Sequence, residues 1–223
     1  MPLDVPRRLP ILDEPRIYDY HYPWDARKAR RNDAEGPGHG PTFRGWGLTV
    51  QRIVAGVGPD GRSAVVRDGG PPVVYRFRPP PGGVDSHSLK GAEPSDDLSG
   101  PGPGEVVIAE LWATGPNLPP GTSDPTLAEQ RWDVESAPGT SKWRLVMMGA
   151  GWQAPMHHTS TVDYDVILSG ELELLLEDGT VTLRGGDTVV LPGVVHGWRA
   201  GPDGAAMAVT MLGVAEGHHQ EPT

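Results

Sequence analysis

The chain has 223 residues, no cysteine and a formal net charge of −10 at neutral pH. Disulfides, thiolate metal sites and cysteine nucleophiles are therefore excluded, and the acidic balance argues against a nucleic-acid partner, which requires a basic face. Gly (31 residues) and Pro (25 residues) make up about a quarter of the chain, which favours an all-β fold with many turns over a helical one.

The N-terminal half combines irregular segments with a first group of strands. Residues 1–45 mix Pro, Tyr and charged residues without a clear period, so we expect an irregular N-terminal arm. The stretches 48–57 and 62–70 flank a Pro-Asp-Gly turn and predict a β-hairpin. A long Pro/Gly-rich surface loop is predicted for residues 69–104, followed by a strand over 105–114.

The C-terminal half, residues 143–213, contains short apolar stretches at regular spacing. Asp178-Gly179 is a strong hairpin signal between two of them. Such spacing is typical of a small antiparallel barrel or sandwich. We therefore divide the chain into the arm, a barrel over 46–215 with the loop as an insertion, and a loose tail over 216–223.

No stretch approaches the ~20 consecutive apolar residues of a membrane span. The first residues, MPLDVPRRLP, lack the apolar run of a secretory leader. The sequence therefore predicts a cytoplasmic protein with no membrane partner.

Three residues in the C-terminal half have the types and spacing of metal ligands. Side chains alternate along a strand, so His157 and Asp163 point the same way, and His196 can meet them from a later strand. Two imidazoles and one carboxylate suit Fe(II) with open positions for substrate and oxygen, although Zn, Mn, Ni and Co take the same ligands.

The segment 151–170, GWQAPMHHTSTVDYDVILSG, resembles the first motif of the cupin family. That motif reads Gly, five residues, His-x-His, three or four residues, Glu, six residues, Gly. The matching positions are Gly151, His157, Thr159 (in place of His), Asp163 (in place of Glu) and Gly170. The resemblance extends to a group of small bacterial cupins with the pattern H-x-T-x-x-x-D-Y.

The segment 185–200, GGDTVVLPGVVHGWRA, resembles the second cupin motif. Gly185, Gly193 and His196 match it, whereas Leu191 stands at the usual proline and Ala200 at the usual asparagine. The resemblance implies a jelly-roll barrel with one divalent metal held by the three ligands named above. Because Thr159 and Asp163 depart from the motif, a metal-free cupin remains an alternative.

Further residues near the motifs are candidates for catalysis and substrate binding. His158 is a rival ligand or an acid–base group, and Asp165 shares the parity of Asp163 and is expected as a second acid. For substrate binding we expect Thr159, Trp152 and Trp198, since aromatic walls suit a planar or apolar ligand.

These features predict a metal-dependent cupin enzyme acting on a small organic molecule, with non-haem Fe(II) dioxygenase chemistry favoured. A metal-assisted lyase, isomerase, cyclase or decarboxylase is an alternative, and so is a non-catalytic small-molecule-binding cupin. A homodimer is also expected, because the alternating aromatic residues of the arm can contact a second subunit.

Overall fold

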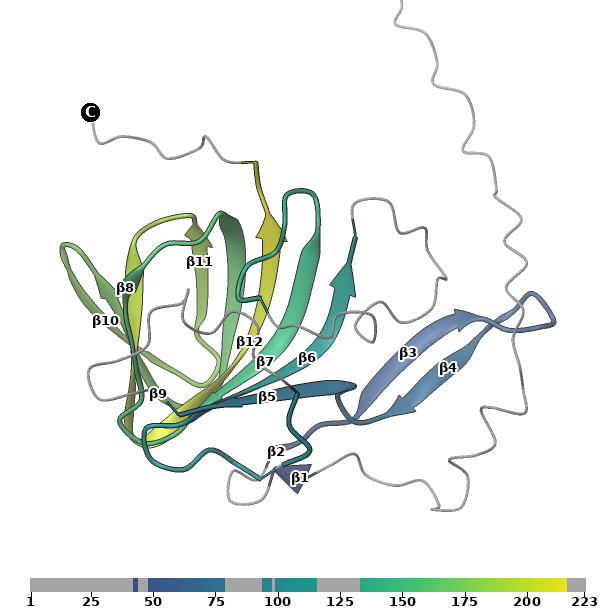
Figure 1. Cartoon of the computed structure of the whole chain (residues 1–223), viewed down its shortest axis with the longest axis horizontal. Helices are drawn as coiled ribbons and strands as arrows, with labels where there is room; N and C mark the ends of the chain where they lie inside the picture. Colours follow the sequence, from purple (N-terminus) through teal and green to yellow (C-terminus); the bar gives the residue numbers. More distant parts are fainter. Residues whose placement is uncertain (1–41, 44–47, 79–93, 98, 116–132, 216–223) are drawn as a thin grey trace, which may run out of the picture.

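The computed structural model describes residues 42–43, 48–78, 94–97, 99–115 and 133–215 (Figure 1). All of the regular secondary structure in these ranges is β. The strands are β1 (Thr42–Phe43), β2 (Leu48–Thr49), β3 (Arg52–Val57), β4 (Ser63–Gly69), β5 (Val73–Phe77), β6 (Val106–Thr114), β7 (Ser141–Met148), β8 (Gln153–His157), β9 (Thr161–Leu176), β10 (Gly179–Arg184), β11 (Thr188–Pro192) and β12 (His196–Gly213).

Two long strands, β9 and β12, pair antiparallel and form the centre of an eight-stranded sheet. Their pairing shifts register between Ala200 and Ala205, opposite Gly170, and the sheet divides there into two halves. The larger half has the order β5-β6-β7-β12-β9-β11, and the smaller half has the order β8-β12-β9-β10. The halves curve around one interior, which confirms the expected all-β cupin jelly roll (Figure 1).

Gly170 makes the bend in β9 possible. Its φ is +76°, a conformation that residues with a Cβ adopt at a cost. The bend also changes which side chains face inward. Before it, odd-numbered residues from Thr161 to Ile167 are buried, and after it the even-numbered Leu172 and Leu174 are buried.

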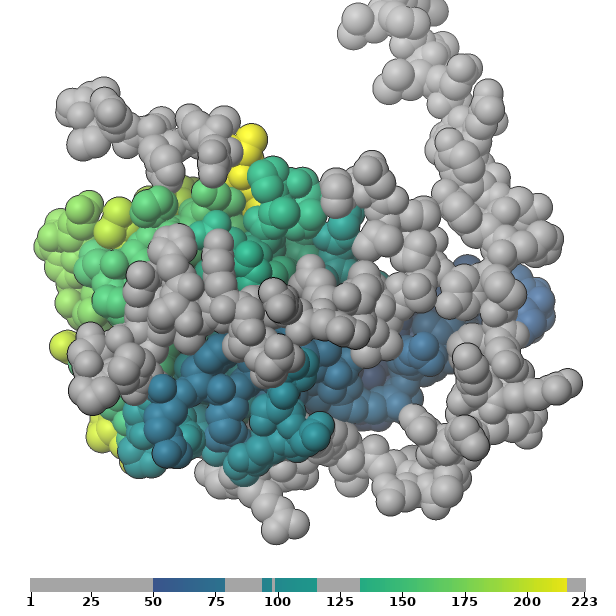
Figure 2. Space-filling view, in the orientation of Figure 1, coloured from purple at the N-terminus to yellow at the C-terminus, as the bar shows by residue number. Residues whose placement is uncertain are grey.

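Strands β3 and β4 form a separate two-stranded sheet, which confirms the predicted hairpin (Figure 1). Blue atoms of this part of the chain lie at the right-hand side of the molecule in Figure 2. The predicted 69–104 loop is too long, because β5 lies inside it and pairs with β6. The rest of that loop falls partly on residues 79–93, outside the described residues. Most of the predicted arm and all of the predicted tail also lie outside them, although β1 shows regular pairing at residues 42–43.

The core lies between the two halves of the sheet. Ile108, Val146 and Ile167 from the larger half pack in one cluster with Leu172 and Leu174 from the smaller half. Within the described ranges, no helix has the length and apolar character needed to cross a bilayer.

Candidate functional site

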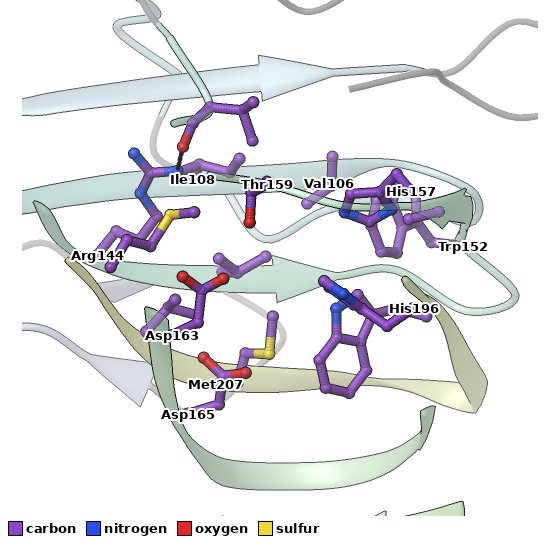
Figure 3. Close-up of a pocket in the computed structure, with 16 residues that line it drawn as sticks. Val106, Ile108, Arg144, Trp152, His157, Thr159, Asp163, Asp165, His196 and Met207 are labelled. Carbon is purple, nitrogen blue, oxygen red and sulfur yellow. Dashed lines mark hydrogen bonds between the residues drawn. The ribbon is translucent and has the colours of Figure 1, made fainter. Parts of the chain in front are cut away.

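One pocket of about 760 Å³, including its open mouth, lies between the two halves (Figure 3). Most of its lining is apolar, and the polar groups come from a few inward-facing positions. The lining residues are Val106, Ile108, Val134, Arg144, Val146, Trp152, Ala154, His157, Thr159, Asp163, Asp165, His196, Trp198, Met207, Val209 and Met211. A concave, mostly apolar site with a few inward-facing polar groups is typical of sites for small organic ligands.

His157 and His196 form a pair at one end of the pocket (Figure 3). They are direct partners across β8 and β12, and their ring centroids are 4.6 Å apart. The Nδ1 of His157 lies 2.8 Å from the carbonyl oxygen of Pro155, and the Nδ1 of His196 lies 2.9 Å from that of Val194. A carbonyl oxygen only accepts, so each Nδ1 carries the proton and donates it. In the uncharged form of such an imidazole, Nε2 keeps its lone pair.

Burial keeps the imidazole of His196 uncharged at neutral pH. The side chain is almost completely buried, and its edge contacts the Trp198 ring at a centroid distance of 5.8 Å. Desolvation lowers the pKa of His196 to about 4, and the nearby His157 adds to that shift, while the hydrogen bond to Val194 opposes it.

Asp163 and Asp165 lie at the other end of the pocket, next to each other on the inward face of β9 (Figure 3). Asp163 accepts the last hydrogen bond in a chain of two hydroxyl groups. Thr161 donates to its Oδ1 at 2.5 Å, and the Thr159 hydroxyl lies 2.7 Å from that of Thr161, which must therefore accept from it. Desolvation raises the pKa of Asp163 to about 6, against the opposing effect of the Thr161 hydrogen bond.

Asp165 has apolar neighbours on both sides. Val189 of β11 and Val209 of β12 are its cross-strand partners. Its Oδ1 is buried and has no hydrogen-bond partner among the described residues. Desolvation, followed by the charge of Asp163, raises the pKa of Asp165 to about 8. A buried carboxyl group with an uncommitted oxygen is an expected position for a ligand contact or a proton transfer.

The raised pKa of Asp165 predicts a pH-dependent stability. In the folded chain Asp165 keeps a proton that the unfolded chain loses above the ordinary pKa of 3.8. The free energy of unfolding therefore falls as pH rises from about 4 to about 8. The Asp165→Asn side chain stays neutral at every pH. The free energy of unfolding of this variant, relative to that of the wild type, should therefore rise by a few kcal/mol from about pH 5 to about pH 8.5. Urea unfolding at both pH values measures this, and an equal difference at both would contradict it.

The three residues expected to bind substrate all line the pocket. Thr159, Trp152 and Trp198 are buried, and the Nε1 of Trp152 has no hydrogen-bond partner among the described residues. His158 differs from this group. Its side chain is exposed and does not line the pocket, because it points to the opposite side of the chain from His157. The expectation that His158 acts as an acid or base in this pocket is therefore wrong.

Sequence reasoning overlooked Arg144, which lies in the pocket wall. Its guanidinium is 2% exposed, forms a 2.9 Å ion pair with Glu110, and donates to the Val134 carbonyl oxygen at 2.9 Å. Arg144 and Glu110 are direct partners across β6 and β7. The signal for this pair was a charged residue inside each of two largely apolar, buried strands, and the match between the two charges appears only when the strands are paired.

The imidazoles of the expected metal site come together, but the carboxylate does not join them. Across the described ranges, no three His, Asp or Glu side chains are grouped so that they could hold one metal ion. Asp163 accepts from Thr161 at the end of the pocket opposite the imidazoles (Figure 3). The arrangement does not fit a three-ligand centre of His157, Asp163 and His196.

No family model matches the chain. It is similar to the Phomopsin biosynthesis cluster protein C' of Diaporthe leptostromiformis, with 42% identity over 65 residues, which are 29% of this chain and 34% of that protein. It is also similar to the Cupin-domain-containing oxidoreductase srdD of Neurospora crassa, with 36% identity over 56 residues, which are 25% of this chain and 29% of that protein. The matched region spans about a third of the length of these curated relatives.

Among solved structures, the chain is similar to an RmlC-like cupin protein of Desulfovibrio desulfuricans, with 27% identity, 35% of this chain and 74% of that chain covered, and a TM-score of 0.30. An RmlC-like cupin of Shewanella frigidimarina has 14% identity, with 63% and 97% covered and a TM-score of 0.34. The chain thus has a cupin-type jelly-roll barrel, carries two segments that resemble the cupin motifs and is locally similar to a cupin-domain protein.

Proposed function

We propose that this cupin binds a small, largely apolar organic molecule in the barrel pocket and transfers protons on it, as a non-oxidative isomerase or lyase does. The observation that supports this most is the presence of two kinds of proton-transfer group in one apolar pocket. Asp165 has a buried oxygen without a partner, and the two imidazoles have uncommitted Nε2 atoms. Groups of this kind, brought together in a water-poor cavity, are suited to general acid–base catalysis.

The proposed reaction step is the conversion of a ligand ketone to its enol. A hydrogen on the carbon next to the carbonyl passes as a proton to the Nε2 of His157 or His196, and the electron pair of the C–H bond forms the new C=C bond. The carbonyl oxygen takes the proton of the Asp165 carboxyl group. The products are an enol, an imidazolium and a carboxylate. In a ketone whose enol is conjugated to a further C=C bond, the imidazolium returns its proton at the far (γ) carbon and the enol hydroxyl returns its proton to Asp165, which completes a double-bond isomerisation and restores both groups.

Hydrogen exchange in D₂O tests this proposal without knowledge of the natural substrate. Chelator-treated protein is incubated with cyclohexanone and with acetophenone, and NMR follows the loss of the hydrogens next to the carbonyl. We expect faster exchange than in buffer, and a loss of about 100-fold in the Asp165→Asn variant. The Asp178→Asn variant, altered at the exposed turn between β9 and β10, is the matched control and should exchange like the wild type.

Two results would contradict the proposal. If both ketones bind but neither exchanges above the buffer rate, the pocket is a binding site without turnover. If exchange survives in the Asp165→Asn variant, the carboxyl group is not the acid.

A metal-dependent oxygenase is the second candidate, because cupins usually bind a metal. The observation that favours it is the orientation of both imidazoles: a histidine whose Nδ1 donates to a carbonyl presents Nε2 to a metal. A metal bound there would supply sites for substrate and oxygen, and the fungal relative named an oxidoreductase is consistent with that chemistry.

Elemental analysis separates the two candidates. For the oxygenase we expect about one first-row metal per chain in protein purified without a histidine tag, and its loss in the His157→Ala, His196→Ala double variant. Oxygen consumption with a bound substrate would then exceed that of the double variant. Metal content that is unchanged in the double variant would exclude the imidazole pair as the ligands.

A further inference from the structure

The hydrogen-bonding groups at the imidazole end of the pocket are acceptors. Because both Nδ1 atoms donate to backbone carbonyls, the Nε2 atoms of the uncharged His157 and His196 rings offer lone pairs and no hydrogen. Within the described residues, neither Nε2 has a hydrogen-bond partner. A ligand group that bonds to these two imidazoles must therefore bring its own proton, as a hydroxyl group does.

The pocket also lacks a cation that could neutralise an anionic ligand. Arg144 is the one Arg or Lys side chain among the described lining residues, and its guanidinium is held by Glu110 and by the Val134 carbonyl. The carboxylate of Asp163 lies in the pocket wall and repels negative charge. A carboxylate or phosphate would lose its hydration here without gaining a counter-charge.

The pocket lining also contains a buried hydrogen-bond donor, the indole of Trp152. The indole Nε1 of Trp152 is buried without a hydrogen-bond partner among the described residues, and Trp152, like His157, lines the pocket. A hydroxyl oxygen accepts from an N–H group while its hydrogen is donated elsewhere, so one hydroxyl can satisfy both an indole and an imidazole.

We infer that the pocket selects a neutral apolar molecule that carries a hydroxyl group, places that hydroxyl at His157 and His196, and rejects carboxylates and phosphates of the same shape. This inference rests on the proposed function only in taking the pocket as the site where a small organic molecule binds. It adds the chemical class of the ligand and the end of the pocket at which its polar group lies.

Three probes with one ring skeleton test the inference on chelator-treated wild-type protein: 4-ethylphenol, its methyl ether 4-ethylanisole, and 4-ethylbenzoate. Titration calorimetry or ligand-observed NMR gives the three dissociation constants. We expect the phenol to bind about fivefold more tightly than the ether, which has lost the donor hydrogen. The benzoate should bind more weakly than the phenol by roughly tenfold or more, because its charge is unpaired in the pocket.

A pair of neighbouring histidines provides the variants. His157→Phe removes an acceptor in the pocket and should reduce the preference for phenol over ether to less than about twofold. His158→Phe makes the same change on an exposed side chain outside the pocket and should keep the preference. If His157→Phe does not fold, the comparison of the three probes on the wild type still decides the inference.

The inference is overturned if the ether binds as tightly as the phenol, if the benzoate binds as tightly as the phenol, or if none of the probes binds. Its failure is distinguishable from failure of the proposed function. A phenol preference without hydrogen exchange on the ketones retains the ligand class and removes the catalysis. Hydrogen exchange on the ketones without a phenol preference retains the catalysis and removes the ligand class.

Discussion

Replacing Gly170 by alanine should destabilise the barrel by about 3–5 kcal/mol and sharply lower the yield of folded protein. A Cβ at this position would lie 2.1 Å from the Gly204 carbonyl oxygen and 2.8 Å from the Ala205 Cα. Both are backbone atoms of β12 and cannot rotate away. The positive φ of Gly170 adds a conformational cost for any residue with a Cβ. Urea unfolding followed by circular dichroism measures the loss.

Gly104→Ala is the matched control for this experiment. Gly104 has a φ of +71°, close to that of Gly170, but a Cβ there meets no atom within 4 Å. This variant should show the conformational cost alone, about 1–2 kcal/mol. If the two variants lose equal stability, close approach of β12 at Gly170 is not the reason that the bend requires glycine.

Replacing Glu110 by leucine should destabilise the protein by about 3–5 kcal/mol, because it leaves the buried charge of Arg144 without its ion-pair partner. The double variant Glu110→Leu, Arg144→Met should recover most of this loss, since neither charge is then buried alone. Thermal and urea unfolding of the two single variants and the double variant give the coupling between the residues.

The ion pair between Glu171 and Arg184 provides a control of the same chemistry. These residues are also direct partners on neighbouring strands, with a 2.7 Å contact, but their side chains are 43% and 67% exposed. Glu171→Leu should cost no more than about 1 kcal/mol, because water solvates the remaining charge. Equal losses at the buried and exposed pairs would contradict the desolvation argument.

The sequence predicts those parts of the fold that local patterns encode. The Asp178-Gly179 signal lies at the turn between β9 and β10, and the Pro-Asp-Gly signal lies between β3 and β4. Both are short-range features in which turn residues and flanking strands agree. The spacing of the two motifs also brings His157 and His196 to one end of one pocket.

The parts that sequence reasoning misses depend on long-range pairing. The short strand β5 lies in a Pro/Gly-rich region and is recognised only through its pairing with β6. Parity correctly indicates that Asp163 faces inward, but it does not give the distance between that carboxylate and the imidazoles across the bend at Gly170. Arg144 is likewise explained only by its partner Glu110 on another strand.

The two halves of β9 bury different residues: odd-numbered ones before Gly170 and even-numbered ones after it. In the first half, the outward residues Tyr164, Val166 and Leu168 are more apolar than the buried carboxyl row, so hydrophobicity alone favours a flipped strand. The Glu–Leu alternation of the second half resists that slip, because a shift of one residue would bury Glu171 and Glu173. The pattern after Gly170 therefore fixes the register of β9, and the inward-facing row before it supplies the carboxyl groups of the pocket.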